Sequence, residues 1–321
     1  MTSKDLLKVN NLKVYYRSPA GKVKAVDGVS FTLGENEVLG IVGESGCGKS
    51  TLATAILKLT RPPCYVEDGE VIFNGKNLLK LEGEDLRRIR WKELSYIPQG
   101  SMNSLNPVMK IGDQIIDVMM THTEISKEEA KEKAGKLLES VGLPSETINM
   151  YPHELSGGMK QRVIIAIATA LEPKLIVADE FTTALDVLVQ RKVIEFLEER
   201  RASIGASMIN ITHDIAVQAM LVHKLAVMYA GKIVELSDVY RIFEEPLHPY
   251  TKGLIMATPV LGEKKVIRGI PGNPPNLLNP PPGCRFYPRC TIAEDKCKHK
   301  SPPLMKVEED RYVACWKYGG E

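Results

Sequence analysis

The sequence of 321 residues predicts an α/β fold with an N-terminal antiparallel β-subdomain, an inserted α-helical subdomain and a small cysteine-rich C-terminal appendage. Three patterns support this fold class. Strand-like runs alternate with helix-like runs, a strongly helical stretch interrupts them after residue 100, and proline becomes dense after about residue 245. We therefore expect two domains, residues 1–245 and 246–321, with the helical subdomain at about residues 100–160 of the first.

The first fifty residues have the alternation of half-buried strands. Apolar side chains recur at every second position in two runs, Val14 and Tyr16 in the first and Val29, Phe31 and Leu33 in the second. The turn-forming sequence SPAG at 18–21 separates the runs, so we expect an N-terminal β-hairpin. VLGIVG at 38–43 then has the composition of a buried strand entering a glycine loop, and TLATAILKL that of a helix.

Residues 126–142, SKEEAKEKAGKLLESVG, have the pattern of an amphipathic helix. Ser126 and Glu129 have the spacing of a capping box, and Gly142 stands where the helix is expected to stop. Five positions form the apolar stripe: Ala130, Ala134, Leu137, Leu138 and Val141. Strand and helix signals then resume with KLIVAD at 174–179, a helix around 187–200 and SMINIT at 207–212.

The composition is that of a soluble globular protein, with 44% hydrophobic and 26% charged residues. A formal net charge of +2 argues against a nucleic-acid partner, which would need a concentrated basic face. The N-terminus lacks the apolar core of a secretory signal, and no apolar run approaches the roughly 18–20 residues that cross a bilayer. We expect an intracellular protein whose membrane contact comes through a partner.

GESGCGKS at 43–50 matches the phosphate-loop pattern GxxxxGK[ST] between a predicted strand and a predicted helix. The glycines let backbone N–H groups surround phosphates, Lys49 neutralises their charge, and the Ser50 hydroxyl is a ligand for Mg²⁺. The alternative is an ordinary glycine-rich turn, which rarely has both flanks correct. The residues expected to bind nucleotide here are Gly43, Ser45, Gly46, Cys47, Gly48, Lys49, Ser50 and Thr51.

Two further segments carry phosphate chemistry. LIVADE at 175–180 reads as an apolar strand ending in Asp179, which would hold the Mg²⁺ hydration shell, and Glu180, placed to polarise a water. The alternative for this pair is a buried strand that ends in two solvated acids. LSGGMKQR at 155–162 places Ser156, Gly157 and Gly158 just before a helix, which makes a second anion site.

Together these motifs resemble ATP-binding-cassette (ABC) proteins over about residues 6–245. GESGCGKS resembles Walker A, LIVADE resembles Walker B, and LSGGMKQ resembles the family signature, with Met159 where many members carry Gln. Gln99 in SYIPQG resembles the Q-loop glutamine. TALD at 183–186, which ends in Asp186, resembles the D-loop, and His213 in ITHD resembles the switch histidine.

The resemblance implies ATP hydrolysis with Glu180 as the general base and with His213 and Lys49 also catalytic. It implies that Gln99 joins Ser50 and Asp179 at Mg²⁺. It also implies that Tyr16 stacks on adenine. Tyr15 is a rival for that role, and Tyr16 is preferred because it shares a strand face with Val14.

The resemblance also answers why one chain has two phosphate-binding segments. It implies that Ser156, Gly157 and Gly158 face the γ-phosphate held by another subunit, so that two cassettes pack head to tail around ATP. One departure is Phe181, which follows the two acids where the family commonly has proline. We expect a different local turn there and no loss of activity.

The tail resembles the C-terminal extension of cassettes from oligopeptide/dipeptide importers, on the evidence of HPYTKGLI at 248–255 and IPGNPP at 270–275. Four thiols suit zinc or an iron–sulfur cluster, and they have no tight C-x₂₋₄-C pair of the kind common in zinc sites: Cys284, Cys290, Cys297 and Cys315. The resemblance implies a [4Fe–4S] cluster acting as a structural staple. Zinc and no metal are the alternatives, and His299 is a rival ligand.

The function so implied is the energy-coupling ATPase of an importer of dipeptides or oligopeptides, peripheral at the cytoplasmic face of the membrane. Its expected partners are two transmembrane permeases, a homologous second ATP-binding subunit or a second copy, and an extracytoplasmic solute-binding protein reached through the permeases. Oligosaccharide or nickel are alternative cargoes. A soluble regulatory cassette and a non-hydrolytic ATP clamp are the alternative kinds of protein.

Overall fold

The structure is a computed structural model that describes residues 5–183, 185–258 and 269–319. It contains two compact units. Unit 1 comprises Met1–Gly34, Val38–Leu79 and Asn210–Glu321, and unit 2 comprises Glu35–Glu37 and Lys80–Ile209. The α/β architecture with an antiparallel β-subdomain and a helical part confirms the predicted fold class. The predicted boundary at 245/246 stays a prediction.

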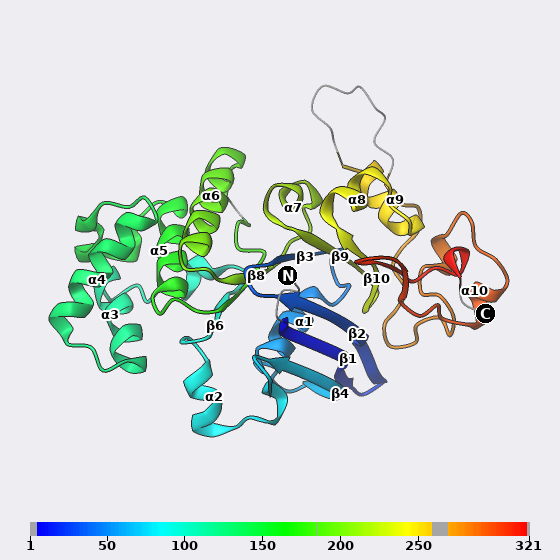
Figure 1. The fold of residues 1–321 in the computed structure, drawn as a ribbon, viewed down its shortest axis with the longest axis horizontal. Helices are drawn as coiled ribbons and strands as arrows, with labels where there is room; N and C mark the ends of the chain where they lie inside the picture. The colour runs from blue at the N-terminus through cyan, green and yellow to red at the C-terminus, as the bar shows by residue number, and fades with distance from the viewer. Residues whose placement is uncertain (1–4, 184, 259–268, 320–321) are drawn as a thin grey trace. The chain divides into compact units, whose positions relative to one another are not determined.

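The first sheet of unit 1 has the order β2-β1-β4-β5, and its paired strands are antiparallel (Figure 1). Its strands are β1 (Asp5–Ser18), β2 (Gly21–Gly34), β4 (Cys64–Phe73) and β5 (Lys76–Asn77). The predicted hairpin is confirmed, because Ser18 pairs with Gly21 and Val14 with Val26. A register shift between Val14 and Tyr16 interrupts the expected alternation.

The second sheet of unit 1 has the strand order β11-β12-β10-β9-β3. Its strands are β3 (Val38–Val42), β9 (Lys224–Tyr229), β10 (Lys232–Asp238), β11 (Met305–Glu308) and β12 (Arg311–Val313). β3 and β9 are parallel, and all five residues of β3 are buried, as expected for a strand covered on both faces. The predicted strand VLGIVG is therefore confirmed.

The helices of unit 1 are α1 (Lys49–Ile56), α7 (Ile215–Leu221), α8 (Val239–Glu244), α9 (Pro249–Met256) and α10 (Lys296–His299). α7 begins after Asp214, whose carboxylate accepts hydrogen bonds from the backbone N–H groups of Ala216 and Val217. This cap satisfies two of the donors that an α-helix leaves free at its start.

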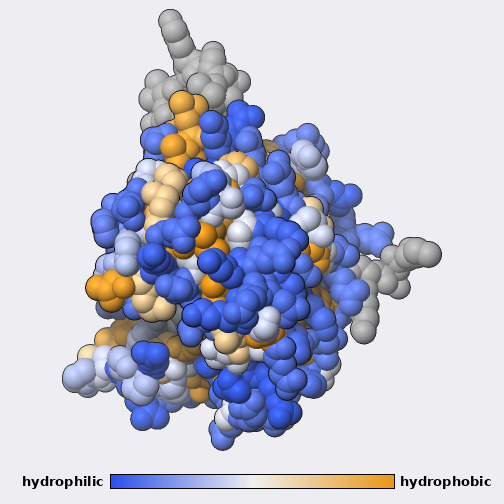
Figure 2. All heavy atoms as spheres, turned by 90° about the vertical axis from the view of Figure 1, so that its left-hand side faces the viewer, coloured by the Kyte–Doolittle hydropathy of each residue, from blue (hydrophilic) through white to orange (hydrophobic). Residues whose placement is uncertain are grey.

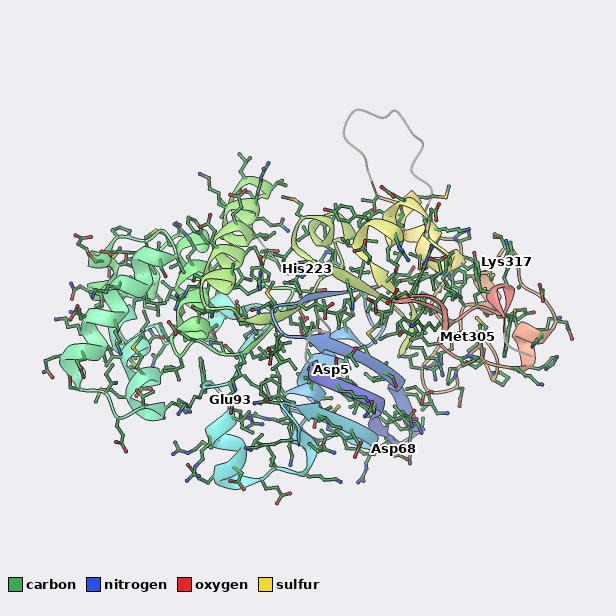
Figure 3. All side chains as sticks on the ribbon, in the orientation of Figure 1. Asp5, Asp68, Glu93, His223, Met305 and Lys317 are labelled. Carbon is green, nitrogen blue, oxygen red and sulfur yellow. The ribbon has the colours of Figure 1, made fainter. Side chains whose placement is uncertain are left out.

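The predicted cysteine-rich appendage is not confirmed, and the C-terminal tail makes long-range contacts within unit 1. Its strand β12 pairs with β10, with Glu235 opposite Val313, so the tail extends a sheet of unit 1 (Figure 1). Phe286 is buried and its ring meets the ring of Tyr229 edge-on at 5.2 Å. Proline density correctly predicts irregular structure at 279–283 but says nothing of these long-range contacts. Figure 3 labels Met305 at the start of β11 and Lys317 near the end of the chain.

In unit 2, β6 (Leu94–Ile97) pairs in parallel with β7 (Leu175–Asp179), and β8 (Ser207–Ile211) lies beside β7. The first three residues of β8 belong to unit 2 and the last two to unit 1. The helices are α2 (Gly83–Ile89), α3 (Ile111–His122), α4 (Lys127–Ser140), α5 (Gly157–Thr169) and α6 (Val187–Ser203). Helices α3 to α6 form the green group in Figure 1.

Helix α4 confirms its predicted details. The Ser126 hydroxyl accepts a hydrogen bond from the Glu129 backbone N–H, and the Glu129 carboxylate accepts one from the Ser126 N–H, which is a capping box. Gly142 follows the helix with a φ of +70°, a conformation that favours glycine. The apolar stripe of this helix is buried as predicted: Ala130, Ala134, Leu137, Leu138 and Val141.

On the face shown in Figure 2, hydrophilic side chains predominate and hydrophobic ones form small separate patches. Within residues 5–183, 185–258 and 269–319, no helix is both long and apolar enough to cross a membrane.

Candidate nucleotide site

The phosphate loop links the end of β3 to the start of α1 in unit 1. The Lys49 ammonium donates hydrogen bonds to the backbone carbonyls of Gly43 at 2.7 Å and Glu44 at 3.2 Å. Lys49 is only 5% exposed, so its positively charged ammonium group is buried inside the phosphate loop. Ser50 and Thr51 are the second and third residues of α1, a helix with no acidic residue in its first turn. A positive charge beside an open helix N-terminus is a site for phosphate.

Two glycines of the loop are required by close contacts. Gly43 has φ +156° and Gly48 has φ +105°, in the left-handed range that favours glycine. A Cβ at Gly43 would lie 2.1 Å from the Met228 carbonyl oxygen, and one at Gly48 would lie 2.1 Å from that of Ala25. The backbones of Met228 and Ala25 cannot move away without disturbing their strands, so the conformation of the loop requires glycine at both positions.

Tyr16 and His213 belong to the same unit as the phosphate loop. The Tyr16 hydroxyl lies 3.0 Å from the Thr51 hydroxyl, whereas the Tyr15 hydroxyl donates to the Asp27 carboxylate at 2.7 Å. His213 is exposed in the segment that follows β8, and the N–H of the preceding Thr212 donates to the Ile41 carbonyl of β3. Tyr16 therefore contacts the residue directly after the phosphate-loop motif, whereas Tyr15 pairs with Asp27.

The predicted acids lie in unit 2 at the end of β7. All five residues of β7 are buried, and Asp179 is 1% exposed. The Tyr96 hydroxyl donates to Asp179 at 3.4 Å, and burial raises the pKa of Tyr96 above its usual value. A tyrosine that stays protonated remains a hydrogen-bond donor to this carboxylate.

Glu180 follows with a left-handed φ of +43°, a conformation rare for residues other than glycine. The Gln99 amide donates to its carboxylate at 2.8 Å, so the structure brings together the predicted Q-loop glutamine and the predicted general base. Phe181 is 4% exposed in the turn that follows. The bulkier ring at this departure from the expected proline is thus buried.

The signature segment of unit 2 begins α5. Ser156 caps the helix by accepting a hydrogen bond from the Met159 N–H at 3.4 Å. Gly157 and Gly158 are the first two residues of α5, so the helix begins two residues earlier than the sequence predicts. A Cβ at Gly158 would lie 2.6 Å from a methyl of Val189, whereas one at Gly157 would meet only ordinary contacts. Ser156 and Gly157 are exposed, so the N-terminus of this helix is open to an anion.

The predicted D-loop precedes α6. The Asp186 carboxylate caps this helix by accepting a hydrogen bond from the Val189 N–H at 3.0 Å. Ala184 of the TALD motif lies outside the described residues. Val187 and Leu188 follow with 80% and 76% of their surface exposed. Two large apolar side chains are therefore exposed directly after the cap.

The four C-terminal thiols line one cavity of about 210 Å³ in unit 1. The backbone N–H of Cys284 donates to the Cys297 carbonyl at 2.8 Å, and burial raises the pKa of the Cys284 thiol to about 11. His248 also lines this cavity, whereas the rival ligand His299 is not among its lining residues. Among the described residues, no group of three or more His, Cys, Asp or Glu side chains has an arrangement that could hold a metal ion.

His248 gives a testable pH dependence. It is 2% exposed, its Nδ1 accepts the Tyr250 N–H at 3.1 Å, and burial lowers its pKa to about 3. Between that value and the unfolded value near 6.5 the unfolded chain binds the extra proton, so stability falls as the pH falls through this window. Through this histidine, lowering the pH from 7.5 to 5 should therefore reduce the free energy of unfolding by about 2 kcal/mol.

The measurement is denaturant unfolding at both pH values for the natural protein and His248→Asn. Asparagine can accept the same N–H, so the helix cap is kept, but it does not titrate. The variant should lose less stability on acidification by about 2 kcal/mol. An equal loss in both proteins would show that His248 does not carry this pH dependence.

Three residues of this region escape sequence reasoning. Tyr96 is the partner of Asp179, Arg289 forms an ion pair with Glu44 of the phosphate loop, and the Tyr250 hydroxyl accepts the Glu44 N–H. The pairs are separated by 83, 245 and 206 residues. The one available signal is that Arg289 directly precedes Cys290.

Known proteins show the same combination of parts. A family profile described as ABC transporter matches residues 26–183, and one described as oligopeptide/dipeptide transporter, C-terminal region, matches residues 234–297. The oligopeptide transport ATP-binding protein OppD of Bacillus subtilis (strain 168) is 46% identical over 97% of this chain and 88% of its own length. The chain belongs to the ABC transporter family.

Two further relatives support this membership. The dipeptide transport ATP-binding protein DppD of Caldanaerobacter subterraneus subsp. tengcongensis is 44% identical to this ABC protein, over 98% of this chain and 97% of that protein. The dimeric structure of a post-hydrolysis state of the ATP-binding cassette MJ0796, bound to ADP and Pi, is similar with a TM-score of 0.65 and 27% identity. It covers 73% of this chain and 98% of the cassette. The predicted resemblance to ABC proteins is confirmed.

Proposed function

We propose that this chain is the ATP-hydrolysing, energy-coupling subunit of an importer of oligopeptides or dipeptides. The similarity to OppD and DppD proteins over nearly the whole chain is the observation that carries the proposal. The phosphate loop supports it, since Lys49 and the open start of α1 form a built phosphate site.

The residue roles follow the chemistry of each side chain. When ATP is bound, the Lys49 ammonium exchanges its loop carbonyl partners for phosphate oxygens, and Ser50 and Asp179 serve the Mg²⁺ ion. Glu180 takes the proton of the attacking water. Gln99 orients the Glu180 carboxylate through the hydrogen bond that its amide N–H donates. His213 holds the γ-phosphate, and Tyr16 stacks on the adenine.

A second ATP-binding subunit, homologous or identical, is the expected partner of the signature segment. Three features of unit 2 support such a partner: the open N-terminus of α5, the capped Asp186 turn, and the exposed Val187 and Leu188. Two permeases, and through them an extracytoplasmic solute-binding protein, complete the assembly. The chain then lies peripherally at the cytoplasmic face of the membrane.

We further propose that the C-terminal thiols, whose arrangement in this structure is not itself that of a metal site, hold a [4Fe–4S] cluster, with Zn²⁺ as the alternative. Support comes from one cavity lined by four cysteines that are spread over some thirty residues: Cys284, Cys290, Cys297 and Cys315. Thiolates are the ligands that iron–sulfur clusters and zinc prefer, and binding would release the protons that burial retains on Cys284, Cys290 and Cys315. The bound group would cross-link a segment with little regular structure.

The cluster proposal predicts metal in the purified protein. Anaerobic preparations should contain iron and acid-labile sulfide, and Cys297→Ser should lose both and melt at a lower temperature. Cys64→Ser is the matched control, because Cys64 lies on β4 and does not line this cavity. Finding zinc without sulfide would favour the alternative metal. Finding neither iron nor zinc would contradict the proposed site.

The importer proposal is tested by reconstitution with the permeases in vesicles. ATP turnover should rise when the solute-binding protein is added together with peptides. Stimulation by oligosaccharide or nickel instead would change the cargo. Failure to associate with permeases, combined with salt-sensitive nucleic-acid binding, would favour the soluble regulatory alternative.

A further inference from the structure

The second residue of the phosphate loop is held by the C-terminal extension. The two guanidinium Nη atoms of Arg289 donate to the two carboxylate oxygens of Glu44, at 2.8 and 2.9 Å. The backbone N–H of Glu44 donates to the Tyr250 hydroxyl at 2.9 Å. Both the side chain and the backbone of Glu44 are therefore fixed by residues more than two hundred positions away in the sequence, all within unit 1.

Arg289 is built into this place. Besides Glu44, its guanidinium donates to the Tyr229 hydroxyl at 3.3 Å and to the carbonyls of Pro271 at 2.8 Å and Ile270 at 3.1 Å. These contacts use all five of its N–H donors. The side chain is 4% exposed, and the rings of Tyr229 and Phe286 lie 5.7 and 5.9 Å from its guanidinium carbon. A guanidinium with every donor satisfied has one orientation, so it can define the position of its partner.

We propose that Arg289 is a positioning residue of the nucleotide site, which keeps the phosphate loop in its binding conformation by holding and neutralising Glu44. Glu44 brings a carboxylate into the same loop as Lys49, which donates to the Glu44 backbone carbonyl, and ATP would bring further negative charge to this loop. Without Arg289, that carboxylate would be unbalanced and would compete with the phosphates for the lysine. The inference rests on the proposed function, since it assumes that this loop binds ATP.

The pairing gives the C-terminal extension a part in ATP binding. Arg289 directly precedes Cys290, one of the four thiols that line the cavity, and Tyr250 follows His248, which lines it too. A structural change in this cavity can therefore shift Arg289 and Tyr250, the two residues that hold Glu44, through only one or two residues of backbone.

The test is equilibrium binding of ATP to the full chain carrying Arg289→Gln, Arg289→Lys, Glu44→Gln or the Arg289→Gln/Glu44→Gln pair. Arg289→Gln should weaken binding about tenfold, within the roughly 2- to 30-fold range of such couplings. Arg289→Lys should lie between it and the natural protein, because lysine keeps the charge but not the two parallel bonds. Adding Glu44→Gln to Arg289→Gln should restore part of the lost affinity, since it removes the unbalanced carboxylate.

The matched control is Arg311→Lys. Arg311 is a buried arginine of the same extension, also 4% exposed at its side chain, but it pairs with Glu245 and Glu308 and not with the phosphate loop. It should leave ATP binding unchanged. Thermal melting without nucleotide shows which variants are folded, and Arg289→Lys and Glu44→Gln keep the test usable if Arg289→Gln does not fold.

Partial recovery in the double variant supports the proposal, because a purely structural arginine would not be rescued by neutralising Glu44. Equal ATP binding by the natural protein and folded Arg289 variants would overturn it, and so would a double variant no better than Arg289→Gln. If the natural protein itself binds no ATP, the proposed function fails instead, and the two failures are distinct.

Discussion

Glu180→Gln is expected to reduce ATP turnover by about 10²- to 10⁴-fold, the usual contribution of a general base, while ATP still binds. The amide oxygen of glutamine can accept the bond that the Gln99 amide now donates at 2.8 Å, so the geometry is kept and only basicity is lost. Steady-state phosphate release and nucleotide binding on the same preparation check this result. A residual rate near that of the natural protein would show that Glu180 is not the base.

The control for this variant is Glu195→Gln on α6. Glu195 forms a surface ion pair with Arg191 at 3.0 Å and is 51% exposed at its side chain, so its neutralisation should leave turnover unchanged. Loss of turnover in both variants would point to a general effect of charge on unit 2. Turnover that depends on Glu180 would also exclude a non-hydrolytic ATP clamp.

Gly48→Ala is expected to abolish measurable ATP binding and to lower the free energy of unfolding by about 2–5 kcal/mol. Alanine at a φ of +105° is strained, and its Cβ would lie 2.1 Å from the Ala25 carbonyl oxygen. The loop must therefore move away from β2 or the strand must shift, and either change disturbs the start of α1. Denaturant unfolding and nucleotide titration measure the two effects.

Gly46→Ala separates strain from contact in this loop. Gly46 also has a left-handed φ, +78°, but a Cβ there would have no neighbour within 4 Å. It should cost only about 1–2 kcal/mol of stability, the strain alone. If the two variants were equally destabilised, the close approach of Ala25 would not be what requires glycine at position 48.

Several parts of the fold follow from local chemistry and could be predicted. The strand into the phosphate loop is a short apolar run before a glycine pattern, and α4 has a capping box and a left-handed glycine stop. Each signal lies within a few residues of the element that it defines. Because backbone hydrogen bonding and capping are local, such signals survive without knowledge of the rest of the chain.

The tail shows where this reasoning ends. Its prolines predict an appendage with little core, yet β12 pairs with β10 and Phe286 is buried against Tyr229. Strand pairing and ring packing depend on which segments meet in three dimensions, and composition carries no record of this.

The sequence by itself determined the family, and it predicts the phosphate loop and the acidic, signature and histidine positions, because phosphate chemistry needs particular residue types at short fixed spacings. Only the tertiary structure decided which tyrosine contacts Thr51, that Gln99 holds Glu180, and that Arg289 holds Glu44. Those are pairings between distant segments, and each is made by side-chain geometry that exists only once the sheets have formed.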